Sequence, residues 1–138
     1  MEPEELKKHL AELTERWGGD LFGVADLEEV TDAIAKEYGE QFNALTRAIS
    51  AAVFFPKLVV NELAQGPTHT YLRYYDTINA RLDDIALRLN NFLQKQGYQA
   101  FPIPASQRVS ESKLAGIFSH RLAAHRAGLG WIGKNCSL

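Results

Sequence analysis

The sequence contains a single cysteine, Cys136, among its 138 residues. One thiol excludes an internal disulfide framework, and it also excludes an iron-sulfur cluster held by this chain alone, because such clusters take about four thiolates. No apolar run approaches the roughly 20 residues that a membrane-spanning helix requires, and the acidic start at residues 1–5 lacks the basic residues of a secretory signal. We therefore expect a cytoplasmic protein without a membrane segment.

Acidic residues are almost missing from the C-terminal part of the chain. Residues 1–84 contain sixteen Asp and Glu and eight Lys and Arg, a net charge of −8, whereas residues 85–138 contain one acid, Glu111, and seven bases, a net charge of +6. Such a basic segment fits a cofactor phosphate, a tRNA backbone or an acidic partner domain. A basic face that pairs with the protein's own acidic half explains the charges equally well.

Hydrophobic patterning predicts helices and strands in alternation. Leu6, Leu10, Leu13 and Trp17 recur at helical spacing and are followed by two glycines that end a helix. Apolar runs predict a strand at 21–25 and another at 48–55, the second central and covered on both faces. A short helix is expected at about 27–38.

The longest predicted element is a helix of about 26 residues between Pro67 and Gly97. Its apolar residues recur at spacings of four and three, which favours one stripe packed as core on the sheet. A third strand is expected at 98–103, then a polar loop at 105–116 and a short helix at 119–128. The resulting expectation is a single α/β (α+β) domain: a mixed three- to four-stranded sheet with helices on both faces.

Three glycines and a lysine lie close together at Gly128, Gly130, Gly133 and Lys134. The spacing matches the Gly-x-Gly-x-x-Gly pattern of dinucleotide-binding loops and nearly matches a P-loop, but both need a preceding strand and a following helix, and here the predicted helix precedes the glycines. A loop that faces a ligand and a set of simple turns around a buried Trp131 remain as the two interpretations.

The string Ala-Gly-Leu-Gly-Trp-Ile-Gly-Lys-Asn at 127–135, after His-Arg-Leu-Ala-Ala-His-Arg at 120–126, resembles the N-terminal domain of the epoxyqueuosine reductase family. These are iron-sulfur and cobalamin reductases related to reductive dehalogenases. Upstream segments agree with a branch of the family, among them Gly-Pro-Thr at 66–68 and Pro-Ile-Pro-Ala-Ser at 102–106. The resemblance covers the chain from about residue 46 to residue 138.

The resemblance implies that this chain is the N-terminal, cobalamin- or substrate-side domain of an oxidoreductase whose two 4Fe-4S clusters belong to a C-terminal module. We therefore expect the chain to be a fragment that is inactive alone. It implies a cobalamin contact in the cleft between the two parts, made by Gly128, Gly130, Trp131, Gly133, Lys134 and Asn135. Its partners would be that module and tRNA.

The expected catalytic aspartate of the family has no counterpart here: an ungapped count places Leu114 at its position, a count that allows the longer loop places residues 104–106 there, and none of these is acidic. Glu111 and His120 are the remaining candidates for a proton donor. Without the family's aspartate, the resemblance does not determine whether tRNA is the substrate. A zinc site is not expected, because His120 and His125 are five residues apart and do not share a helix face. The alternative function is a non-catalytic module whose basic C-terminal part binds tRNA or an acidic protein.

Overall fold

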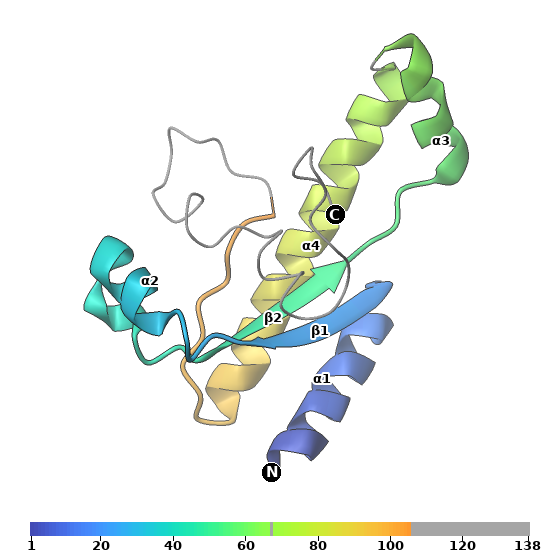
Figure 1. Cartoon of the computed structure of the whole chain (residues 1–138). Helices are drawn as coiled ribbons and strands as arrows, with labels where there is room; N and C mark the ends of the chain where they lie inside the picture. Colours follow the sequence, from blue (N-terminus) through green and yellow to red (C-terminus); the bar gives the residue numbers. More distant parts are fainter. Residues whose placement is uncertain (67, 106–138) are drawn as a thin grey trace.

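Two antiparallel strands form the centre of the fold in the computed structural model, which describes residues 1–66 and 68–105 (Figure 1). The architecture is α+β within a single domain. The elements follow in the order α1 (Pro3–Arg16), β1 (Leu21–Asp26), α2 (Thr31–Tyr38), the 3₁₀ turn η1 (Glu40–Phe42), β2 (Arg47–Ala52), α3 (Lys57–Asn61), the 3₁₀ turn η2 (Glu62–Gln65) and α4 (His69–Lys95).

Helix α1 confirms the first predicted helix. Pro3 occupies its first turn, where a missing N–H costs nothing, and Leu10 and Leu13 are buried on one face. The buried Thr14 hydroxyl donates to the Leu10 carbonyl oxygen at 2.9 Å, so this buried polar group has a hydrogen-bond partner. The helix ends at Arg16 with Trp17 as its C-cap, and Gly18 follows with a φ of 97°, a left-handed conformation that glycine adopts without strain.

Gly19 has no room for a side chain. A Cβ built there would lie 2.6 Å from Cγ2 of Thr14 and 3.1 Å from the Thr14 carbonyl oxygen. We expect Gly19→Ala to lower the free energy of unfolding by about 1–3 kcal/mol, measured by urea denaturation, because the turn must shift to relieve the overlap. Thr14→Ser keeps the hydroxyl but removes the methyl, so it should recover part of the loss. A double variant no more stable than Gly19→Ala alone would contradict this account.

The strands β1 and β2 pair from Leu21 opposite Ala52 to Asp26 opposite Arg47. Since successive side chains alternate between faces, Phe22 and Ile49 point to one side, where they pack with Leu10 and Ile85. Ala25 and Ala48 point the other way into a smaller cluster with Leu27, which follows β1, Ile34 of α2 and Phe42 of η1. The sheet thus joins two hydrophobic clusters.

A strand is present where one was predicted at 48–55, but it is shorter and less buried than expected. β2 ends at Ala52, and residues 48–52 are only half-buried. The backbone N–H of Phe54 donates to Oδ2 of Asp20 at 2.7 Å instead of continuing the ladder. Among the described residues β2 is paired with one strand, so the expectation that it is central is not supported there.

Helix α4 confirms the longest prediction, with Thr68 as its N-cap accepting from the Tyr71 N–H at 3.1 Å. The expectation that its whole apolar stripe is core is confirmed only in part, because in the first half Tyr71, Ile78 and Leu82 are half-buried and Tyr75 is exposed. Ile85 and Leu89 are buried, whereas Tyr75 is 41% exposed. Figure 1 gives the reason: the N-terminal half of α4 extends past the end of the sheet, beside α3.

The strand predicted at 98–103 was wrong. These residues form an extended segment without ladder pairing that runs back along α4 (Figure 1). Pro102 and Pro104 have no N–H to contribute to a ladder. The segment is held instead where the Ala105 N–H donates to Oδ1 of Asp83 at 2.8 Å. In the part of the chain that the structure describes, the sheet therefore has two strands, and no helix there is long and apolar enough to cross a membrane.

Candidate functional site

The site residues predicted from the sequence all lie outside the described residues. This applies to the proton-donor candidates Glu111 and His120 and to the proposed cobalamin contacts, Gly128, Gly130, Trp131, Gly133, Lys134 and Asn135. Their grouping into one site stays a prediction. Among residues 1–66 and 68–105, no cluster of three or more His, Cys, Asp or Glu is arranged to hold a metal ion.

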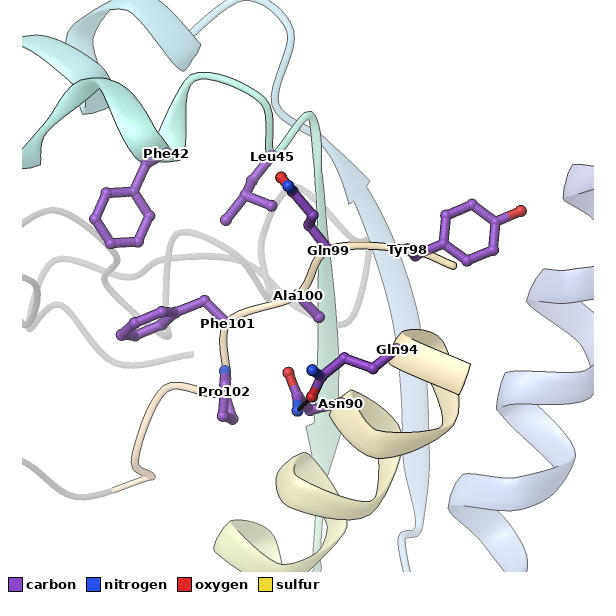
Figure 2. A pocket seen from close by; sticks show the side chains of 9 residues that line it. All are labelled: Phe42, Leu45, Asn90, Gln94, Tyr98, Gln99, Ala100, Phe101 and Pro102. Atoms are coloured by element: carbon purple, nitrogen blue, oxygen red, sulfur yellow. Dashed lines mark hydrogen bonds between the residues drawn. The ribbon is translucent and has the colours of Figure 1, made fainter. Parts of the chain in front are cut away.

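An open cavity of about 480 Å³ lies between η1, the C-terminal end of α4 and the extended segment after it. This volume is within the range of small-molecule sites, roughly 300–1,000 Å³. Its described lining contains aromatic and carboxamide side chains but no charged group: Phe42, Leu45, Asn90, Gln94, Tyr98, Gln99, Ala100, Phe101 and Pro102 (Figure 2).

Two phenylalanine rings form the apolar wall of this cavity. The rings of Phe42 and Phe101 meet edge to face, with centroids 5.3 Å apart and planes inclined by 75°. Phe42 is buried in the small core cluster, whereas Phe101 is 47% exposed. The wall is therefore anchored in the core through Phe42 and exposed to solvent at Phe101. The Tyr98 ring points away from the other side chains in Figure 2.

Two amides on consecutive turns of α4 form the polar floor. Nδ2 of Asn90 donates to Oε1 of Gln94 at 2.7 Å and makes a longer contact of 3.3 Å with Oδ1 of Asn91. These bonds use the Asn90 amide nitrogen and the Gln94 oxygen. Both carboxamides line the cavity together with the segment that carries Ala100 and Phe101 (Figure 2).

A second surface feature is the apolar far end of the molecule, formed by α3, the chain before it and the first half of α4. Phe55 stacks on Tyr71 with ring centroids 5.1 Å apart. Around them, four large hydrophobic side chains are 43–78% exposed: Phe54, Leu58, Leu72 and Tyr74. Large exposed apolar patches often mark protein interaction sites.

Comparison of the chain with models of protein families, with curated proteins and with solved structures finds no match.

Sequence reasoning missed the cavity because its walls come from three separate segments and none of them carries a motif. The only available signal was the concentration of amide and aromatic residues on both sides of Gly97, from Asn90 to Phe101. That stretch was interpreted as the end of a helix followed by a strand. Without the strand, its side chains are free to line a cavity.

Proposed function

We propose that this chain is the N-terminal, cobalamin- or substrate-side domain of an iron-sulfur oxidoreductase similar to epoxyqueuosine reductase. The observation that carries the proposal is the string Ala-Gly-Leu-Gly-Trp-Ile-Gly-Lys-Asn at 127–135. Its three glycines allow a backbone to approach a ligand closely, and its lysine adds a positive charge beside them.

Two features of the described fold support a place within a larger protein. The exposed apolar end around Leu58 and Leu72 offers a surface that further polypeptide could cover. Within the described residues each strand has one partner strand, so neither outer edge of the sheet is paired by that part of the chain. In the proposal, added strands complete a mixed sheet of three to four strands with helices on both faces.

Cobalamin and two 4Fe-4S clusters would supply the redox chemistry, with electrons passing from the clusters to cobalt or to the substrate. The clusters belong to a C-terminal module, since Cys136 is the chain's single cysteine. The amides of Gly130 and Gly133, with Lys134 and Asn135, would hold the corrinoid's amides or nucleotide tail. Trp131 would pack against the corrinoid, and Glu111 or His120 would supply the proton that the substrate takes up.

The iron content of the protein made from the complete reading frame tests whether it is an iron-sulfur protein. We expect iron and acid-labile sulfide at the stoichiometry of two 4Fe-4S clusters, with cysteines spaced Cys-x-x-Cys-x-x-Cys-x-x-x-Cys-Pro twice after residue 138. The 138-residue chain purified in the same way is the matched control and should contain no cluster. A complete reading frame without those cysteines would contradict the proposal.

The charge asymmetry favours a second candidate, a non-catalytic module that binds tRNA or an acidic protein through its basic C-terminal part. Salt distinguishes the two functions. Nucleic-acid binding by phosphate contacts should weaken steeply between 50 and 200 mM salt, roughly tenfold or more for several contacts. Corrinoid binding through backbone amides should change little over the same range. Salt-sensitive tRNA binding without any corrinoid binding would support the second candidate.

A further inference from the structure

We propose that the chain after Ala105 continues along α4 and covers the exposed side chain of Leu72. The interaction surface is the face of α4 around Leu72, and its partner is a later segment of the same chain. This role is independent of the proposed corrinoid contact, because the segment precedes the glycine-rich string. The contact is made by three large apolar residues that follow the described part of the chain: Leu114, Ile117 and Phe118.

Two hydrogen bonds set the direction in which the chain passes Ala105. The Tyr98 N–H donates to the carbonyl oxygen of Leu93 at 2.9 Å. Further along, the Ala105 N–H donates to Oδ1 of Asp83 at 2.8 Å. Leu93 and Asp83 lie on the same helix, about 15 Å apart along its axis. The extended segment between the two bonds therefore advances by about that distance, and it runs towards the N-terminus of α4 (Figure 1).

Leu72 lies on the face of α4 that the extended segment follows. Leu72 precedes Asp83 by about three turns, and the two differ by about 20° around the helix axis. Asn90 follows Asp83 by about two turns, also within about 20°, and it lines the cavity beside the extended segment. One line along α4 thus joins Asn90, Asp83 and Leu72. The extended segment follows this line from Asn90 to Asp83, so its continuation leads to Leu72.

The length of the following chain is sufficient for this contact. Along α4, Leu72 is about 17 Å beyond Asp83. The chain from Ala105 to Leu114 spans up to about 30 Å when extended, so the apolar residues reach Leu72 without a fully straight path. Leu72 is 53% exposed, and apolar side chains placed over it remove that surface from water.

The two partners carry opposite charges. Residues 106–138 contain five Lys and Arg and one Glu, a net charge of +4. On the same face of α4, Asp76 is an exposed carboxylate about 10 Å before Asp83. Arg108 comes shortly after the bond to Asp83, about 10 Å further along an extended chain, so it is within reach of Asp76. An exposed ion pair contributes little free energy, so the apolar contact provides most of the binding.

Paramagnetic broadening in the 138-residue chain tests where the segment lies. A nitroxide on Arg73→Cys, in a Cys136→Ser background, should broaden the backbone amide signals of the three apolar residues in ¹H–¹⁵N spectra. A nitroxide on Lys95→Cys in the same background is the control, because it is about 33 Å away along α4 and should leave those signals sharp. No broadening from the label at position 73, or equal broadening from both labels, would overturn the proposal.

A mixture of two samples distinguishes this contact from one made by a second copy of the chain. Spin-labelled protein without ¹⁵N is mixed with unlabelled ¹⁵N protein, so any broadening must come from another molecule. We expect sharp signals in the mixture. Broadening there as strong as within the labelled chain would assign the cover to a second copy and overturn the proposal.

A matched pair of substitutions tests whether Leu72 makes the contact. Leu72→Asn should raise the rate of trypsin cleavage after Lys113 about tenfold, because cleavage requires the segment to detach and the lost apolar contact makes detachment more frequent. Tyr74→Asn is the control. Tyr74 is 43% exposed on the same helix but lies about 160° away around its axis, so its replacement should leave the rate unchanged. Equal cleavage rates in the two variants would contradict the contact at Leu72.

Discussion

Replacing Ile85 with alanine should lower the free energy of unfolding by about 3–4 kcal/mol. Ile85 is 1% exposed and lies in the cluster that joins α4 to Leu10 of α1 and to the sheet. The loss combines the hydrophobic transfer of the removed carbons with the cavity left among neighbours on three elements. In a chain of this size it corresponds to a fall in Tm of roughly 10 °C.

Leu87→Ala is the matched control for this measurement. Leu87 lies on the same helix two residues away but is 51% exposed, so its replacement should change stability by less than about 0.5 kcal/mol. Urea denaturation of both variants followed by far-UV circular dichroism gives the comparison. Similar losses for the two variants would mean that α4 is not attached to the domain through the face that carries Ile85.

Trp131→Ala in the protein made from the complete reading frame should weaken hydroxocobalamin binding roughly 30-fold. The reason is that, in the proposed function, Trp131 provides the largest apolar contact with the corrinoid, and aromatic anchors dominate binding energies. Trp131→Phe retains a flat aromatic ring and should recover much of the affinity. If Trp131→Ala bound normally, or if it lost its clusters as well as the ligand, the contact assigned to Trp131 would be wrong.

Local patterns predicted the elements in which apolar residues recur at helical spacing over several turns. Leu6, Leu10 and Leu13 located α1, and the stripe that includes Ile85 and Leu89 located α4. The pattern gave no information on how far the sheet extends beneath the helix. Consequently it did not predict that the stripe leaves the core towards Tyr75, because burial depends on the partner as well as on the helix itself.

The error at 98–103 has the same origin. The aromatic and apolar residues there are compatible with a strand, but a strand needs a ladder partner, and Pro102 and Pro104 remove two donors. The backbone instead follows α4 until Ala105 bonds to Asp83, a contact between residues 22 positions apart that no local pattern encodes. The cavity near Phe101 exists because of this path. Its amide floor at Asn90 and Gln94 could therefore be recognised only in the structure.

We propose that this chain provides one wall of a corrinoid site in an iron-sulfur protein. Hydroxocobalamin titrated into the protein from the complete reading frame, with its clusters intact, tests this through the visible spectrum. We expect a saturable shift of the corrinoid bands that persists in moderate salt. An unchanged spectrum with intact clusters would be incompatible with a corrinoid site.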